Sequence, residues 1–318
     1  MKKARKIAII TALALIISGT VLFAVGMYFS DWDINKLSIV KYENKSYEIG
    51  ESFKEIMIYA GSDDIEIVPS DDGKCRFDFM DIEMVYHSAY VEENVLKIKR
   101  ADKRKWYEQI FISFQNPQMT IYLPAGQYEK LSVKSSTGTT RIPKDFSFNS
   151  IDIECSTGNV FCCSSVKTKA SIKSSTGNIT VKDISAGGLE LTASTGNISL
   201  KNIKCSGNIS IKVSTGSVNI GSVSCKKLVS TGSTGNLRVE KSLCSSDFYA
   251  SRSTGNITLD RFDAESLYIK TSTGDVAGSL LSEKVYITDT STGRVRVPKT
   301  VSGGKCEIKT STGDITFE

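Results

Sequence analysis

One histidine and scattered carboxylates limit the chemistry that this chain can perform. The 318 residues include a single histidine, His87, without a partner motif, so a Ser-His-Asp or Cys-His site would have to form around that one residue. Carboxylates of the C-terminal part, for example Asp152, Asp183 and Asp260, are scattered over the repeat and do not fall in one column. We therefore expect no enzymatic activity and no cofactor, and we expect His87 to lie at the surface or in a capping segment.

Lysine side chains are the stronger candidates for ligand binding. From Glu129 to Glu318 the sequence has 24 Lys and Arg against 17 Asp and Glu, an excess of seven positive charges. Five lysines each lie four residues before the glycine of a Ser-Thr-Gly tripeptide: Lys134, Lys173, Lys212, Lys270 and Lys309. We predict that they align as one basic column that contacts polyanions. The alternative is a solvated face that only resists aggregation.

A second basic cluster precedes the tripeptides. Lys103, Arg104 and Lys105 are followed directly by Trp106. Basic residues beside an aromatic ring are typical of segments at the boundary between water and lipid headgroups. We predict an interfacial loop here, with a loop that binds nothing as the alternative.

The eight cysteines do not form a metal-binding motif. There is no Cys-x-x-Cys pair and no nearby histidine, so we expect no metal site. Cys205, Cys225 and Cys244 each follow a tripeptide glycine by nine residues. We favour buried free thiols, which behave as small apolar side chains. The alternative is a disulfide between Cys155 and Cys162 or Cys163.

A repeat of 19 or 20 residues must position these side chains. Ten Ser-Thr-Gly tripeptides recur at this spacing, with the glycines Gly138, Gly158, Gly177, Gly196, Gly216, Gly235, Gly255, Gly274, Gly293 and Gly313. Mostly apolar residues alternate with other residues on both sides of each tripeptide, which indicates a strand, an arc and a second strand. Only stacking of equivalent strands in parallel makes each apolar position part of a continuous core. The sequence therefore predicts an all-β fold, a parallel β-solenoid with 19–20-residue coils.

The tripeptide marks a corner of each predicted coil. Glycine reaches the positive φ that a tight arc requires, and the residue after it is often asparagine, which tolerates left-handed geometry. Stacked in register, residues such as Asn159, Asn178 and Asn197 are expected to form a ladder in which each amide bonds its copies above and below. Alternatively, they are turn residues without further contacts.

The N-terminus reads as a membrane anchor. Met1 to Lys6 carries four basic residues, and Ile7 to Phe29 follows without a charge, long enough for a membrane-spanning helix. The basic residues favour a cytoplasmic N-terminus, which places the bulk of the chain outside the cytoplasm. The alternative is a cleaved signal peptide. Signal peptides have a shorter apolar region than this one, and a small-residue cleavage site follows that region. We divide the chain into an anchor (1–30), a tether (31–46), atypical N-terminal β coils (47–127) and a ten-coil solenoid (128–318).

The extracytoplasmic part resembles a family of bacterial β-strand-repeat proteins of unknown function that are often labelled "putative adhesins". The matching features are the anchor helix, the segment Gly61 to Ile67, the element Ile121 to Pro124 and the repeats from Leu131 onward. The resemblance implies a protein of the cell envelope without a catalytic signature. We expect a membrane-anchored binding or scaffold module that contacts anionic wall polymers, lipid headgroups or envelope proteins, and no nucleic acid. The alternative is a polysaccharide-active β-helix enzyme.

The last repeat suggests a further contact. Glu318 follows the final tripeptide glycine by five residues, so we predict an uncovered C-terminal coil with Ile315 and Phe317 at its core positions. An uncovered coil has unpaired backbone groups and exposed apolar side chains, and it is expected to pair weakly with a second copy.

Overall fold

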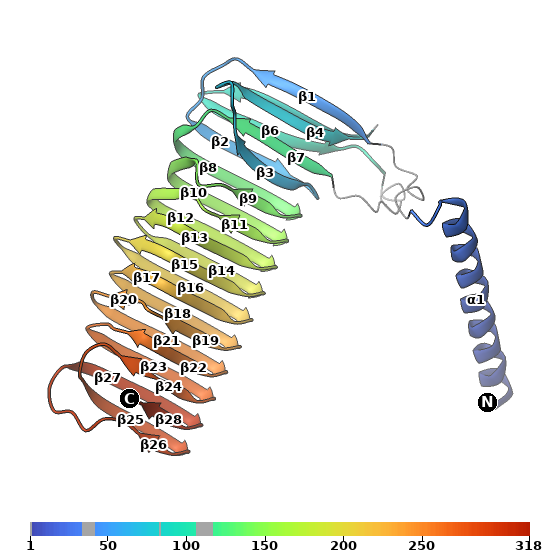
Figure 1. Ribbon diagram of the computed structural model, residues 1–318. Helices are drawn as coiled ribbons and strands as arrows, with labels where there is room; N and C mark the ends of the chain where they lie inside the picture. The colour runs from blue at the N-terminus through green and yellow to red at the C-terminus, as the bar shows by residue number, and fades with distance from the viewer. Residues whose placement is uncertain (1, 34–41, 83, 106–116) are drawn as a thin grey trace.

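The computed structural model describes residues 2–33, 42–82, 84–105 and 117–318. In these residues one helix, α1 (Lys2–Phe29), precedes 28 strands, and the strands stack into an elongated solenoid (Figure 1). The segment Lys3–Phe29 of α1 has a mean hydropathy of 2.5 and is long and apolar enough to span a membrane. The predicted parallel β-solenoid of about ten regular coils is confirmed.

Each regular coil has three sides, and the longest strands form the side that we call face 1. In spatial order from the N-terminal end, face 1 contains β6 (Val95–Asp102), β2 (Glu55–Ala60), β8 (Gly126–Thr137), β10 (Phe146–Thr157), β12 (Ser165–Thr176), β14 (Leu189–Thr195), β16 (Asn208–Thr215), β18 (Lys227–Thr234), β21 (Asp247–Thr254), β23 (Ser266–Thr273), β27 (Gly304–Thr312) and β25 (Lys284–Thr292). All these pairings are parallel.

In the coils that carry a Ser-Thr-Gly tripeptide, face 2 follows that corner. In spatial order it contains β7 (Gln118–Leu123), β3 (Asp64–Pro69), β9 (Thr140–Ile142), β11 (Val160–Cys162), β13 (Ile179–Ala186), β15 (Ile198–Cys205), β17 (Val218–Cys225), β19 (Leu237–Glu240), β22 (Ile257–Phe262), β24 (Val276–Leu280), β28 (Ile315–Phe317) and β26 (Val295–Arg296). Face 3 closes the coil through the ends of longer strands and the short β20 (Leu243–Cys244).

The core lies inside these three faces. On face 1, Ile172 of β12 pairs with Leu191 of β14, which pairs with Ile211 of β16, and all three side chains are fully buried. Burial of one such side chain contributes about 1.5–3 kcal/mol. Because the same positions stack from coil to coil, the alternation in the sequence becomes a continuous apolar column.

The tripeptide glycines have the positive φ that the sequence predicts, for example 151° at Gly158 and 144° at Gly216. They also allow close contact between coils. A Cβ atom at Gly158 would overlap the carbonyl oxygen of Gly138 in the neighbouring coil, and one at Gly216 would overlap that of Gly196. Glycine is therefore required at this corner for two reasons, backbone conformation and the spacing of the coils.

The asparagines after these glycines form a ladder of a different kind from the one expected. The backbone N–H of Asn178 donates to Oδ1 of Asn159 at 2.9 Å, and that of Asn197 donates to Oδ1 of Asn178 at 2.9 Å. The contacts therefore join a side chain to the backbone of the next coil. They satisfy N–H groups that the turn leaves outside the strand pairing.

A second left-handed corner, which the repeat does not predict, lies between faces 2 and 3. Its residues recur every 19 or 20 positions, with φ of 58° at Asp183, 54° at Asn202, 56° at Ser222, 47° at Lys241 and 49° at Arg261. These five residue types have little in common, which explains why no motif marks the corner.

The coils at the C-terminal end are not stacked in sequence order. β27 lies between β23 and β25, and β28 lies between β24 and β26, so the C-terminal coil is second from the end (Figure 1). The prediction that this coil is uncovered is therefore wrong: Ile315 and Phe317 are 0% and 4% exposed.

The inward positions of the two coils explain this order. Tyr286 and Thr288 of the outermost coil lie in register with Cys306 and Ile308 of the C-terminal coil. The coil with the more polar inward residues occupies the end, where its core side is least covered. Lys284 of the outermost coil is buried and pairs with Asp263 at 2.7 Å.

The N-terminal end also departs from sequence order. β2 lies between β6 and β8, so the coil formed by β2 and β3 is enclosed by later segments of the chain. Antiparallel strands cover this end: β4 (Cys75–Asp81) pairs with β7 and with β1 (Glu43–Ile49), and β5 (Val85–Glu92) pairs with β6. We call the segment from β1 to β7 the cap.

Candidate functional site

The five lysines that share a repeat position lie on face 1 and point outward in one column. Lys134 is in register with Glu154, which is in register with Lys173; threonine or serine occupies the coils between Lys173, Lys212 and Lys270. Because the C-terminal coils exchange places, Lys309 is a direct neighbour of Lys270. The repeat position therefore brings the lysines to one face, with gaps between them.

Carboxylates neutralise both ends of this column. The Glu154 carboxylate lies 3.6 Å from Nζ of Lys134 and 3.7 Å from Nζ of Lys173. Glu307 lies 2.8 Å from Nζ of Lys309 and raises the pKa of that lysine. Lys212 makes no ion pair with the described residues. The sequence could have predicted the first neutralisation, because Glu154 occupies the same repeat position as the lysines.

A shallow groove of about 650 Å³ lies beside the N-terminal end of the column. Cationic side chains of Arg100, Lys134 and Lys173 line it together with serine hydroxyls and Glu154. Hydroxyl and ammonium donors suit the oxygens of a phosphate or carboxylate ligand, whereas the negative charge of Glu154 repels such a ligand.

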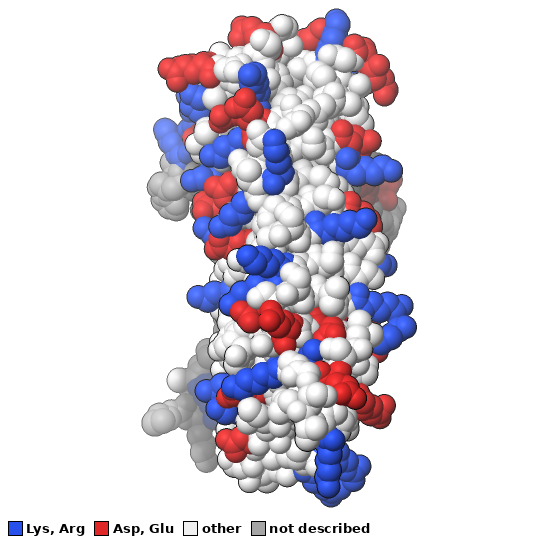
Figure 2. Space-filling view, turned by 90° about the vertical axis from the view of Figure 1, so that its left-hand side faces the viewer, with Lys and Arg blue, Asp and Glu red and all other residues white. Residues whose placement is uncertain are grey.

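The positive charge is concentrated in the middle coils. Residues 160–241 contain 11 Lys and Arg against three Asp and Glu. Seven of these lysines form no ion pair with the described residues: Lys167, Lys182, Lys201, Lys204, Lys212, Lys226 and Lys241. Figure 2 shows basic side chains spread over one face of the rod, with carboxylates between them. We call these seven residues the unpaired lysines.

Two of the unpaired lysines are stacked directly. Lys182 of β13 is in register with Lys201 of β15 in the next coil. Lys167 and Lys204 line a second groove of about 570 Å³, together with Ser165, Ser185 and other hydroxyl side chains of face 3. This concentration of lysines was not among the predicted features, although it follows from a count of charges coil by coil.

The predicted interfacial loop is only partly within the described residues. Nζ of Lys103 lies 5.1 Å from the ring centre of Tyr86, a cation–π contact. The guanidinium of Arg104 donates two hydrogen bonds to Asp102, at 2.9 and 2.6 Å, and lowers the pKa of that carboxyl. Lys105 is at the edge of the described segment and Trp106 is outside it, so the loop remains a prediction.

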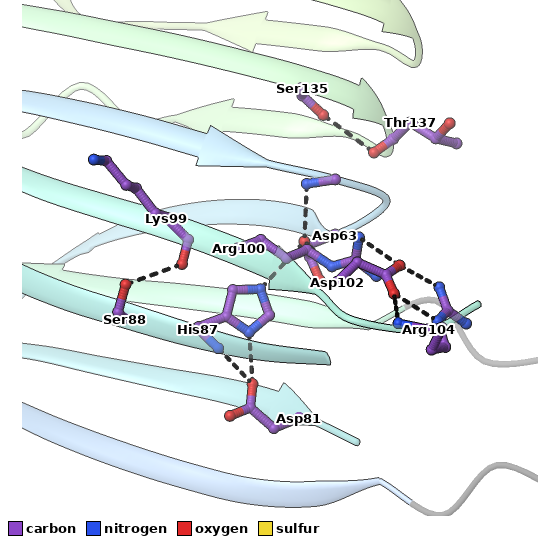
Figure 3. Close-up of polar contacts among 11 residues, drawn as sticks. Asp63, Asp81, His87, Ser88, Lys99, Arg100, Asp102, Arg104, Ser135 and Thr137 are labelled. Atoms are coloured by element: carbon purple, nitrogen blue, oxygen red, sulfur yellow. Dashed lines mark hydrogen bonds and ion pairs between the residues drawn. The ribbon is translucent and has the colours of Figure 1, made fainter. Parts of the chain in front are cut away.

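The most enclosed charged groups of the described residues surround His87 in the cap (Figure 3). Nδ1 of His87 lies 2.6 Å from Asp81 and Nε2 lies 3.3 Å from Asp63, and each of these three side chains is at most 2% exposed. Nε of Arg100 lies 3.6 Å from Asp63, and Nζ of Lys45 lies 3.4 Å from Asp81. The cluster therefore joins β1, the β2–β3 turn, β4, β5 and β6.

Two carboxylates determine the protonation of His87. Burial alone would lower its pKa, but the hydrogen bonds and charges of Asp63 and Asp81 raise it above the ordinary value of 6.5. Both ring nitrogens face carboxylates, so neither is left to accept a proton from a substrate. This arrangement fits a structural clamp, and its place in the cap agrees with one of the two positions expected for His87.

All eight cysteines are free in the structure, and seven of them are buried. The Sγ atoms of Cys155 and Cys162 approach different carbonyl oxygens, those of Gly138 at 3.9 Å and Ser164 at 4.0 Å. The structure therefore does not contain the alternative disulfide between Cys155 and Cys162 or Cys163.

Several bacterial proteins of known structure are similar to this chain. A "putative adhesin" of Parabacteroides distasonis is 13% identical, with a TM-score of 0.49 over 88% of this chain and 98% of that chain. A "putative lipid binding protein" of the same species is 16% identical, with a TM-score of 0.46 over 87% and 97%. A "putative adhesin" of Bacteroides fragilis is 14% identical, with a TM-score of 0.42 over 87% and 97%.

At the level of sequence, no curated protein matches the chain. A family profile does match, in two overlapping segments that cover residues 53–242 and 224–318. These segments begin in the cap and include every tripeptide repeat. The chain therefore belongs to the Toastrack DUF4097 family.

Proposed function

We propose that this protein is a membrane-anchored, extracytoplasmic binding module of the bacterial cell envelope that contacts phosphate-rich polyanions. Helix α1 would anchor it, and the four basic residues before the apolar segment favour an N-terminus in the cytoplasm. Polyanions available outside the membrane are wall polymers and lipid headgroups, and this location excludes nucleic acid as a partner.

The observation that carries the proposal is the set of unpaired lysines. Neighbouring coils of a solenoid lie about 4.8 Å apart, so lysines in register, such as Lys182 and Lys201, hold like charges close together. This repulsion destabilises the free protein and is relieved by a bound polyanion. A rigid row of cations also matches a polymer with regularly spaced negative charges.

Charge reversal tests the proposal in the full-length protein in neutral nanodiscs. One variant changes the column (Lys173→Glu, Lys212→Glu, Lys270→Glu) and another changes the middle coils (Lys182→Glu, Lys201→Glu, Lys204→Glu). A control reverses three exposed lysines elsewhere (Lys54→Glu, Lys74→Glu, Lys144→Glu). We expect the wild type and the control to be retained on immobilised anionic polymer and both test variants to lose at least tenfold in affinity.

Salt and ligand source complete the test. Wild-type binding should weaken as salt rises through about 0.1 M, where the Debye length is about 10 Å. Separate arms with a phosphate-rich wall polymer and with phosphatidylglycerol vesicles identify the source of the phosphate. Equal retention of all variants, or binding that salt does not affect, would contradict the proposal. No contact among the described residues favours the enzymatic alternative.

A further inference from the structure

Two cysteines in neighbouring coils have their sulfur atoms in contact. Cys225 ends β17 and Cys244 ends β20, and the two residues are in register on face 3. Both side chains point into the core, with exposed fractions of 6% and 3%. Their Sγ atoms are 3.4 Å apart. Among the described cysteines this is the only pair with a recorded sulfur–sulfur contact.

The backbone geometry at this pair permits a disulfide. Adjacent strands lie about 4.8 Å apart, and disulfides usually join Cα atoms 4.4–6.8 Å apart. Small rotations about the Cα–Cβ bonds can therefore close the remaining gap between the sulfur atoms. Cys205 lies in the same column, but its Sγ approaches the carbonyl oxygen of Asn208 at 3.8 Å.

The two thiols also differ in acidity. A hydrogen bond from Cys244 lowers the pKa of Cys225 against the effect of burial, and it raises the pKa of Cys244. Burial raises the pKa of the six other cysteines: Cys75, Cys155, Cys162, Cys163, Cys205 and Cys306. Because the thiolate is the nucleophile in disulfide exchange, Cys225 is the cysteine most suited to begin it.

We propose that Cys225 and Cys244 form a reversible disulfide that joins two consecutive coils, made by exchange with an external disulfide. The Cys225 thiolate attacks one sulfur of that disulfide, forming a mixed disulfide and releasing one thiolate. Cys244 then gives its proton to solvent and attacks Sγ of Cys225, which releases the second thiolate. Two cysteine thiols are oxidised, and one external disulfide is reduced to two thiols.

The position of the pair gives the cross-link a structural role. β20 contains only Leu243 and Cys244, and its register with β17 consists of the pairs Ser224–Leu243 and Cys225–Cys244. Strand β19 ends just before it, and Lys241 between them has a left-handed φ of 47°. A disulfide would therefore hold two coils together where their parallel pairing is short. This role does not depend on polyanion binding.

Alkylation and mass mapping of the full-length protein in detergent test the proposal. The reduced protein is incubated with oxidised glutathione, both in its folded state and during refolding, and is then denatured in N-ethylmaleimide. We expect six alkylated cysteines instead of eight, and a linked peptide pair that contains Cys225 and Cys244. Cys205→Ser is the matched control, with five alkylated cysteines and the same linked pair.

Removal of one partner gives the converse result. In Cys244→Ser no linked pair should form, Cys225 should keep a glutathione adduct because the thiol that resolves it is missing, and the six other cysteines should be alkylated. Oxidation of this variant should no longer raise the melting temperature as it does in the wild type. Eight alkylated cysteines in the wild type under both conditions would overturn the proposal. A linked pair of other cysteines, or a glutathione adduct on Cys225 that Cys244 does not resolve, would also overturn it.

Discussion

At the scale of single residues, each tripeptide glycine meets two requirements of its corner, a positive φ and a close approach to the backbone of the neighbouring coil. Their positive φ could be predicted because a short arc between two strands needs it. The close approach of each glycine to a carbonyl group of the neighbouring coil could not be predicted, because it depends on how closely the coils stack. The predicted bonds between asparagine side chains are wrong for the same reason. The sequence indicates which residues stack, but not the path of the backbone between them, and it is a backbone N–H that donates to each amide oxygen.

We predict that Gly216→Val lowers the free energy of unfolding by roughly 3 kcal/mol or more. Valine is strained at a φ of 144°, and its Cβ would overlap the Gly196 carbonyl. Gly221→Ala is the control, since a Cβ there meets no atom within 4 Å, and its effect should stay within about 0.5 kcal/mol. Thermal melts of the two variants decide the matter, and equal melting temperatures would contradict the double role of the corner glycines.

The His87 cluster predicts a stability that depends on pH. The folded protein raises the pKa of His87 above 6.5, so folding favours the protonated ring. The stabilisation is fully present below about pH 6.5 and is lost as the pH rises through the raised value. The difference in melting temperature between the wild type and His87→Gln should therefore shrink as the pH rises above about 6.5. A constant difference would show that protonation of His87 does not stabilise the cap.

The sequence could not have predicted this cluster. Asp63, Asp81, His87 and Arg100 come from separate segments, and they meet only because antiparallel strands cover the parallel coils of the cap. No spacing rule connects these residues. The basic column is the opposite case, because residues at one repeat position must share a face.

At the scale of elements, the order of the coils is the main feature that the repeat did not indicate. A repeat of 19 or 20 residues specifies each coil but not which coil lies outermost. The physical signal was present in the inward positions, since Tyr286 and Thr288 tolerate partial exposure better than Cys306 and Ile308. To predict the order of the coils, one must compare the free-energy cost of exposing the inward side chains of each coil at the end of the stack.

We predict that hydrogen exchange reveals this order. β27 pairs with strands on both sides, whereas β25 pairs with β27 alone. Amides of residues 305–311 should therefore exchange at least tenfold more slowly than those of residues 285–291, although they lie closer to the C-terminus. Amides of β23 serve as the internal reference for a strand paired on both sides. Faster exchange in β27 than in β25 would indicate that the coils stack in sequence order.

At the scale of the whole molecule, the structure is a rod with distinct regions. Antiparallel strands and the His87 cluster cover the N-terminal end, unpaired lysines are concentrated in the middle coils, and a coil with polar inward residues forms the other end (Figure 1). This end still has an unpaired strand edge, β25, and exposed apolar side chains nearby. The predicted self-association therefore has a different surface from the one expected, namely the outermost coil.

We predict weak association of two copies through this outermost coil. Ile287 and Val295 are 48% and 43% exposed, and β25 has unpaired backbone groups along its free edge. The proposed membrane anchor would give the protein a high local concentration in the plane of the membrane, where a weak contact is sufficient to form dimers. Sedimentation velocity of the full-length protein in detergent should show dimers that increase with concentration.

The double variant Ile287→Lys and Val295→Lys should remove these dimers, because charges at a strand edge oppose pairing with another strand. Leu243→Lys is the matched control: this side chain is 51% exposed but lies in the middle of the rod. Retention of dimers in the control and their loss in the double variant would place the contact at the end of the solenoid. A monomeric wild type at high micromolar concentration would contradict the association. Equal loss in both variants would assign it to general surface hydrophobicity.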